Sequence, residues 1–107
     1  MAIDRLRKTE EFREVFTKGN KKIGRYMILY ILKTAHRKNR IGIIIKKKVG
    51  NAVKRNQLKR QLKEIFRKQD QSKLIITGYS IIVLAKEKII QAHFSDLETE
   101  FKELIQS

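Results

Sequence analysis

Apolar side chains change their spacing several times along the chain, and each spacing predicts a different secondary structure. Between Thr9 and Gly19 they recur at three- and four-residue intervals, at Phe12, Val15 and Phe16. This pattern predicts an amphipathic helix over residues 9–18, with Thr9 as its N-cap and Gly19 at its end. Residues 1–7 form a basic arm that we expect to be extended and anchored by Leu6.

Three later segments are typical of strands. Residues 23–33 are apolar on both faces, which predicts a strand covered on both sides. Residues 41–46 predict a second strand, and the short polar link before it favours antiparallel pairing of these two. Residues 80–86, S-I-I-V-L-A-K, predict a third, buried strand. The connection from 41–46 to this strand is long enough for a crossover, which would make that pair parallel.

Two further helices are expected. The first covers about residues 52–68, with Asn51 as its N-cap and one apolar face formed by Leu58, Leu62, Ile65 and Phe66. A polar loop over 69–73 follows, and residues 74–77 are ambiguous. The last helix begins with Ser95 and Glu98 as a capping box. Its apolar face comprises Phe94, Leu97, Phe101, Leu104 and Ile105.

The element order is therefore α-β-β-α-β-α, which indicates one small sheet with helices packed on it. The length of 107 residues predicts a single domain over residues 1–107. No apolar run is long enough to span a membrane, and the chain has no cysteine, so we expect a cytoplasmic protein without disulfides.

Charge changes this picture most at residues 46–68. They hold ten Lys and Arg side chains against the single acid Glu64, a net +9 within a chain of net +15. Like charges recur at i, i+4, as in Arg55–Lys59, and only Arg60–Glu64 is a favourable pair of that spacing. A bound polyanion explains this arrangement best, and nucleic acid is the leading partner class. A solvated lysine-rich face and an anionic membrane surface are the alternatives.

Catalytic chemistry is not indicated. His36 and His93 are far apart in sequence, no cysteine is present, and no motif for a nucleotide cofactor occurs. A stand-alone nuclease would need a cluster of carboxylates or histidines, and the sequence suggests none. Phe12, Phe16 and Tyr30 have two interpretations: they pack in the core, or they stack on single-stranded bases beside basic groups.

Residues 47–60, K-K-V-G-N-A-V-K-R-N-Q-L-K-R, closely resemble the signature of the bacterial ribonuclease P protein component. L-R-K-T-E-E-F-R-E-V-F-T-K-G at 6–19 and G-Y-S-I-I-V-L-A-K at 78–86 extend the resemblance to roughly residues 5–105. The resemblance implies an α/β (α+β) two-layer sandwich, with about three helices on a small sheet of about four strands. It also implies a left-handed βαβ crossover, against the usual right-handed rule.

The same resemblance implies two binding sites. The residues that would contact the catalytic RNA subunit are Lys47, Lys48, Asn51, Arg55, Asn56, Lys59, Arg60 and Lys63. The residues of a cleft for the single-stranded 5′ leader of precursor tRNA would be Phe12, Phe16 and Tyr30. Two positions depart from the family pattern: Gln57 replaces an Arg, and Lys63 stands where Arg is frequent, which removes planar guanidinium forks.

The expected function is therefore that of a ribonuclease P protein subunit, which assists an RNA catalyst in removing the 5′ leader from precursor tRNA. Mg²⁺ would serve the holoenzyme and be bound mainly by RNA, with no cofactor intrinsic to the protein. The alternative is a general structured-RNA-binding or ribosome-associated protein, which would not need Phe12, Phe16 and Tyr30 exposed together in one groove.

Overall fold

The computed structural model describes residues 4–72 and 78–107, so the ambiguous segment 74–77 lies outside the described residues. The elements in chain order are α1 (Thr9–Lys18), β1 (Asn20–Ile23), β2 (Met27–Lys33), β3 (Arg40–Ile44), α2 (Ala52–Gln71), β4 (Tyr79–Ala85) and α3 (Phe94–Gln106). Two short 3-10 helices, η1 (Lys47–Val49) and η2 (Glu87–Gln91), precede α2 and α3. This order is consistent with the predicted α-β-β-α-β-α arrangement and contains one further strand, β1.

The four strands form one mixed sheet in the order β1-β2-β4-β3. Strand β4 is parallel to β3 and antiparallel to β2, and β1 is antiparallel to β2. The predicted parallel pair is therefore confirmed, with α2 in the βαβ crossover to which the family resemblance assigns a left hand. The predicted antiparallel pairing of β2 with β3 is wrong, because β4 lies between them. Five of the seven β4 residues are buried, which suits a central strand.

The strand predicted over residues 23–33 begins later, at Met27, and it forms a hairpin with a strand that was not predicted, β1. Strand β1 ends at Ile23, and Gly24 donates its N–H to the carbonyl of Met27 across the turn at 2.8 Å. The carboxylate of Glu100, on α3, accepts hydrogen bonds from the backbone N–H groups of Arg25, Tyr26 and Met27 at 2.6–2.9 Å. This contact joins residues more than 70 positions apart, so local sequence patterns do not contain it.

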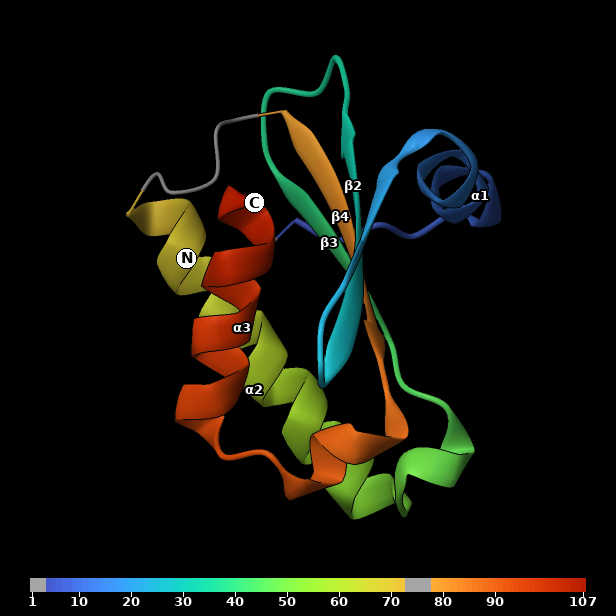
Figure 1. The fold of residues 1–107 in the computed structure, drawn as a ribbon. Helices are drawn as coiled ribbons and strands as arrows, with labels where there is room; N and C mark the ends of the chain where they lie inside the picture. Colours follow the sequence, from blue (N-terminus) through green and yellow to red (C-terminus); the bar gives the residue numbers. More distant parts are fainter. Residues whose placement is uncertain (1–3, 73–77) are drawn as a thin grey trace.

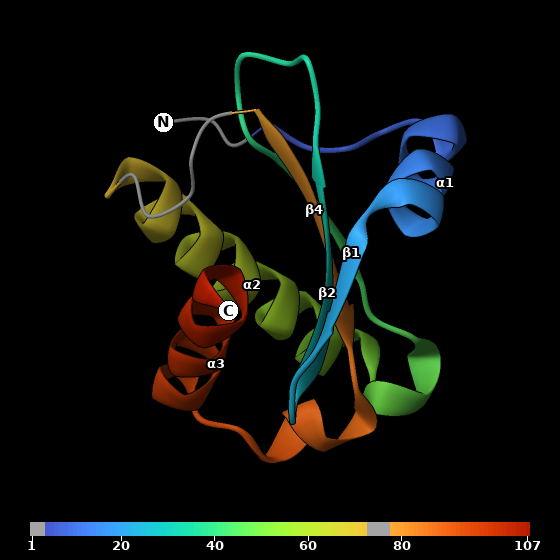
Figure 2. The same cartoon turned by 45° about the horizontal axis from the view of Figure 1, so that its top comes forward.

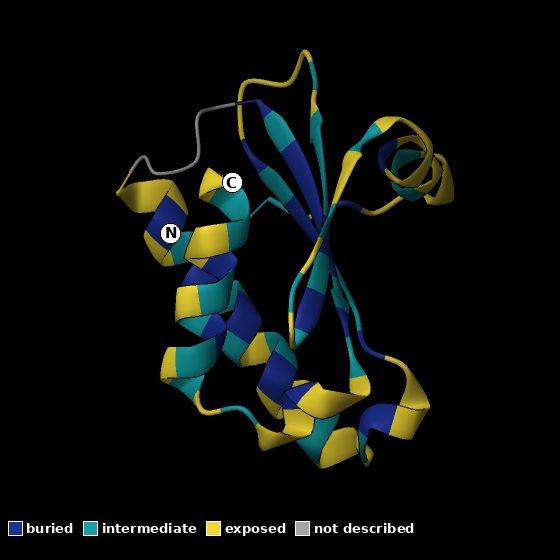
Figure 3. Ribbon diagram, in the orientation of Figure 1, coloured by how far each residue is buried: buried dark blue, intermediate teal, exposed yellow. Residues whose placement is uncertain are grey.

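Helices cover both faces of the sheet, as Figures 1 and 2 show: α2 and α3 lie together on one face, and α1 lies on the other. The larger core lies between the sheet and α2 and α3, and includes Met27, Leu29, Ile81, Phe66 and Phe101. A smaller cluster under α1 consists of Leu6, Val15 and Ile82, with Phe12, Tyr30, Leu32 and Ile44 packed against it. In Figure 3 most of α1 is exposed or intermediate, and Val15 is its one buried residue.

Capping was predicted correctly for one helix of three. Asn51 caps α2, because its side-chain oxygen accepts from the N–H of Lys54 at 2.8 Å. Helix α1 covers Thr9–Lys18 as predicted, but its N-cap residue is Lys8 rather than Thr9. Helix α3 is capped at His93 rather than at Ser95, and Asp96 accepts from the His93 N–H at 3.0 Å.

Helix α2 is longer than predicted and runs to Gln71 instead of ending near residue 68. Gln69, expected in a polar loop, is buried within the helix. The side chain of the buried Asn39 donates to Asp70 at 2.8 Å and accepts from the N–H of Tyr79 at 2.8 Å. Asn39 thereby ties the last turn of α2 to the start of β4.

The basic arm is anchored as expected. Leu6 is buried, its N–H donates to the carbonyl of Ile41 at 3.0 Å, and the Ile41 N–H donates to the carbonyl of Asp4 at 3.1 Å. The arm therefore pairs with the outer edge of β3 at Arg5 and Ile41. Among the residues the structure describes, no helix is long and apolar enough to cross a membrane.

Candidate nucleic-acid interface

The basic stretch begins with a loop that the start of α2 holds in place. Asn51 caps the helix, and Arg55, one turn later, donates its Nε–H to the carbonyl of Gly50 at 3.1 Å. Arg55 is half-buried, so its side chain orders the loop and the residue remains partly accessible to solvent. Lys47 and Lys48, in η1, are exposed beside this loop.

The predicted RNA-contacting side chains differ in exposure. Asn56 and Arg60 are exposed on α2, whereas Lys59 and Lys63 are half-buried. Lys48 forms an ion pair with Glu87 of η2 at 3.2 Å, but both side chains are more than 60% exposed, so the pair contributes little to stability. Most of the basic segment therefore remains available to an anionic partner.

Glu64, the one acidic residue of the basic segment, does not form its ion pair with the predicted partner. The carboxylate of Glu64 accepts from the Nε of Arg67 at 2.8 Å, so the pair is Arg67–Glu64 at i, i+3 rather than Arg60–Glu64. The hydrogen bond from Arg67 lowers the pKa of Glu64, and the same contact raises the pKa of Arg67. Glu64 thus neutralises Arg67 near the end of the segment and does not neutralise Arg60.

The three predicted cleft aromatics lie on the α1 face of the sheet, in two separate contacts. The rings of Phe16 and Tyr30 pack edge to face, with centroids 4.7 Å apart and an interplanar angle of 74°. The ammonium of Lys21, on β1, lies 5.9 Å from the Tyr30 ring centroid. Phe16 is 38% exposed, so this pair presents an aromatic surface beside a cation.

Phe12 lies at the other end of α1, against β3. Its ring is one wall of a pocket of about 200 Å³ at the edge of the sheet, which we call the edge pocket. The lining residues are Arg5, Leu6, Phe12, Ile41, Gly42, Ile43, Lys59 and Lys63. The structure thus brings a leader-cleft aromatic together with two lysines predicted to bind the RNA subunit, although α1 and α2 lie on opposite faces of the sheet.

Sequence reasoning missed several basic residues that line pockets. Arg5 contributes to the edge pocket from the N-terminal arm. A second pocket, of about 380 Å³, is lined by Lys86 and Lys88, which were not predicted as site residues, and by Lys46 and the predicted Lys48 of the basic segment. Lys86 and Lys88 follow β4 directly, and no sequence signal distinguishes them from a solvated strand end.

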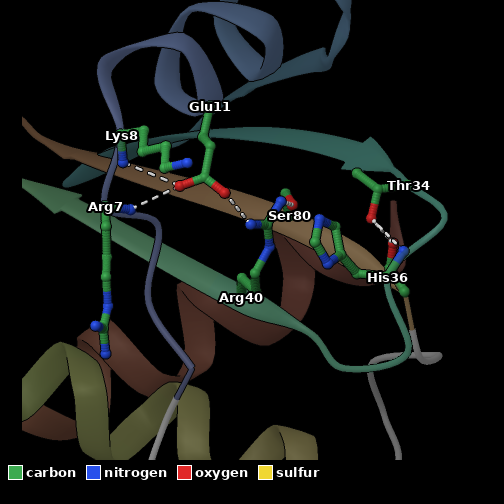
Figure 4. A network of polar contacts seen from close by, with 8 residues as sticks. Arg7, Lys8, Glu11, Thr34, His36, Arg40 and Ser80 are labelled. Atoms are coloured by element: carbon green, nitrogen blue, oxygen red, sulfur yellow. Dashed lines mark hydrogen bonds and ion pairs between the residues drawn. The ribbon is translucent and has the colours of Figure 1, made fainter.

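A polar network fixes the first turn of α1 (Figure 4). The Glu11 carboxylate accepts from the backbone N–H of Lys8 at 2.9 Å and of Arg7 at 3.0 Å, and it forms an ion pair with Arg40 of β3. The guanidinium of Arg40 also donates to the hydroxyl of Ser80 on β4 at 3.2 Å. The two backbone donors, followed by Arg40, lower the pKa of Glu11 to about 2.

The residues that the structure describes contain no group of three or more His, Cys, Asp or Glu side chains that could hold a metal ion. His36 and His93 belong to different regions: His36 is in the β2–β3 connection, and His93 caps α3.

A family model described as Ribonuclease P matches residues 2–107. The chain belongs to this family. The ribonuclease P protein component of Alkaliphilus oremlandii is 36% identical over 104 residues, covering 97% of this chain and 90% of that protein. The ribonuclease P protein component of Clostridioides difficile is 36% identical over 100 residues, covering 94% of this chain and 87% of the relative.

Solved ribonuclease P proteins have the same fold. The protein from Thermotoga maritima superposes with a TM-score of 0.85 at 29% identity and covers 96% of both chains. The protein from Staphylococcus aureus also gives a TM-score of 0.85, at 26% identity, covering 98% of this chain and 94% of that one. The expected α/β sandwich and the family resemblance are both confirmed.

Proposed function

We propose that this chain is the protein subunit of ribonuclease P and assists endonucleolytic removal of the 5′ leader from precursor tRNA in the cytoplasm. Its partners are the catalytic RNA subunit and the single-stranded leader. The observation that supports this most is the edge pocket, where Phe12 shares one cavity with Arg5, Lys59 and Lys63. An aromatic ring beside several cations suits a flexible single strand, since bases stack and phosphates bind cations.

Two groups of residues have different roles in this proposal. The RNA subunit binds the start of α2 and its preceding loop, through Lys47, Lys48, Asn51, Arg55, Asn56, Lys59, Arg60 and Lys63. The leader lies on the α1 face, where Phe16 and Tyr30 offer an aromatic surface and Lys21 a nearby cation. Phe12, together with Lys59 and Lys63, connects the two regions around the edge of β3.

In this proposal catalysis resides in the RNA subunit. Mg²⁺ ions, bound mainly by RNA and substrate, supply charge stabilisation and an activated water when present. The protein chain neutralises phosphates, positions the leader and so favours metal binding indirectly. Gln57 stands, exposed, where the family pattern has Arg, so the neighbouring Arg55 and Arg60 carry the arginine contacts at this point of α2.

The test is single-turnover cleavage of a precursor tRNA by a bacterial ribonuclease P RNA at low Mg²⁺, with and without this protein. We expect a large gain in rate or substrate affinity that shrinks when the leader is shortened to one nucleotide. A stimulation that ignores leader length would contradict the cleft assignment. No stimulation, together with tight and salt-sensitive binding to any structured RNA, would favour the general RNA-binding alternative.

A further inference from the structure

Strands β3, β4 and β2 present one cross-strand row of residues to α1. In the sheet register Gly42 of β3 pairs with Ile82 of β4, which in turn pairs with Tyr30 of β2, so these three residues face the same side. Side-chain size increases along this row, from none at Gly42 to a full aromatic ring at Tyr30. The sheet surface under α1 is therefore low at Gly42 and raised at Tyr30.

The two aromatic residues of α1 are one helical turn apart and meet opposite ends of this row. The ring of Phe12 occupies the space where Gly42 lacks a side chain: a Cβ built on Gly42 would lie 2.5 Å from Phe12 Cε1 and 2.8 Å from its Cζ. Phe16 instead packs edge to face on the Tyr30 ring and is 38% exposed. Phe12 therefore lies close to the backbone of β3, whereas the Tyr30 ring separates Phe16 from the backbone of β2.

The backbone conformation does not require glycine at position 42, and the space beside it leaves no room for a larger side chain. Gly42 lies in a regular strand, and among the described residues only Gly78 has a positive φ, so an alanine could adopt the backbone of Gly42. Helix α1 could not easily move away from a larger residue at position 42. Glu11, next to Phe12, forms an ion pair with Arg40, which lies two residues before Gly42 on β3. An added methyl group would therefore have to displace the Phe12 ring, and it would also lie 3.2 Å from Leu6 Cδ1.

We propose that Gly42 is a positioning residue for the leader site: it seats Phe12 against β3, so that Phe12 walls the edge pocket and Phe16 is the aromatic surface offered to an unpaired leader base. This inference rests on the proposed function. It assigns the two aromatics different tasks, Phe12 as a fixed wall beside Lys59 and Lys63, and Phe16 as the stacking ring.

The test uses the holoenzyme reconstituted with a bacterial ribonuclease P RNA and two precursor tRNAs, one with a long leader and one with a single-nucleotide leader. Gly42→Ala should raise KM for the long-leader substrate about tenfold, since small misplacements of binding groups have effects of this size or larger. Its KM for the short-leader substrate and its affinity for the RNA subunit should stay at the wild-type values.

Phe12→Leu provides the rescue, because leucine lacks the two ring atoms that the new methyl group would meet. The double variant Gly42→Ala/Phe12→Leu should bind the long-leader substrate no worse than Phe12→Leu alone. If Gly42→Ala alone does not fold, the double variant should restore folding. Gly24→Ala is the control: its methyl group would meet the Glu100 side chain at 2.6 Å, so it should lower Tm without any leader-dependent effect.

The inference would be overturned by an unchanged long-leader KM in Gly42→Ala, by an equal loss on both substrates, or by additive losses in the double variant. A double variant that also fails to fold would do the same. Failure of the proposed function is distinguishable, because the wild-type protein would then stimulate cleavage of neither substrate.

Discussion

The carboxylate of Glu11, in the first turn of α1, is bound by the guanidinium of Arg40, at the start of β3. The same carboxylate accepts two backbone N–H groups of the turn that leads into α1. One side chain thus joins the N-terminal arm, α1 and the sheet. It thereby sets where α1 and its aromatic residues lie on the α1 face.

This contact predicts a specific acid dependence of stability. The pKa of Glu11 is lowered from 4.5 to about 2, so its contribution is present above pH 4.5 and is lost as the pH falls towards about 2. The free energy of unfolding of Glu11→Gln should therefore be lower than that of wild type near neutrality, and the difference should shrink through this window. Denaturant unfolding at a series of pH values measures it. Glu10→Gln, at the exposed neighbouring position, is the control, and a difference that stays constant down to about pH 2 would contradict the assignment.

Glu100→Gln should destabilise the β1–β2 hairpin. The carboxylate accepts three backbone N–H groups of Arg25, Tyr26 and Met27, and an amide cannot replace both oxygens as acceptors. We expect a loss of about 1–3 kcal/mol in the free energy of unfolding, the usual cost of leaving such donors unsatisfied. Thermal or urea unfolding measures this loss. Glu103→Gln, at an exposed position of the same helix, should unfold like wild type, and equal losses in the two variants would refute a specific role for Glu100.

Asn51 allows helix capping and RNA binding to be separated. Asn51→Ala removes the acceptor for the Lys54 N–H and should reduce the free energy of unfolding by about 1 kcal/mol. Asn51→Asp retains a capping oxygen but adds a negative charge to the proposed RNA surface, so its stability should match wild type while its affinity for the RNA subunit falls. Filter binding of the two variants, alongside their unfolding curves, tests this. Wild-type RNA affinity in Asn51→Asp would remove Asn51 from the interface.

Arg60 should contribute one phosphate contact. It is exposed on α2 within the basic segment, and Glu64 is engaged by Arg67 instead. Arg60→Ala should weaken RNA-subunit binding and reduce the slope of log K against log salt concentration by about 1. Lys102→Ala, on the exposed surface of α3, removes the same charge and should leave the slope unchanged. Equal slopes for both variants would mean that overall charge, and not the α2 face, determines binding.

Local sequence patterns determined much of this protein. Helix α1 lies where the spacing of Phe12, Val15 and Phe16 placed it, and Asn51 caps α2 as predicted. The concentration of charge at residues 46–68 and the signature within it already indicated an RNA-binding protein of this family. These features depend on residues a few positions apart, or on composition alone, so the sequence displays them directly.

Tertiary structure decided the remaining features. The placement of β4 between β2 and β3, the division of residues 20–33 into a hairpin and the extension of α2 to Gln71 all depend on contacts between distant residues. Glu100 reaches Tyr26 across 74 positions, and Asn39 reaches Asp70 across 31. The different environments of Phe12 and Phe16 likewise arise because Gly42 and Tyr30 occupy opposite ends of one row of the sheet. Strand pairing and packing bring these partners together only after the chain has folded, and no local periodicity records which distant residue will fill a given position.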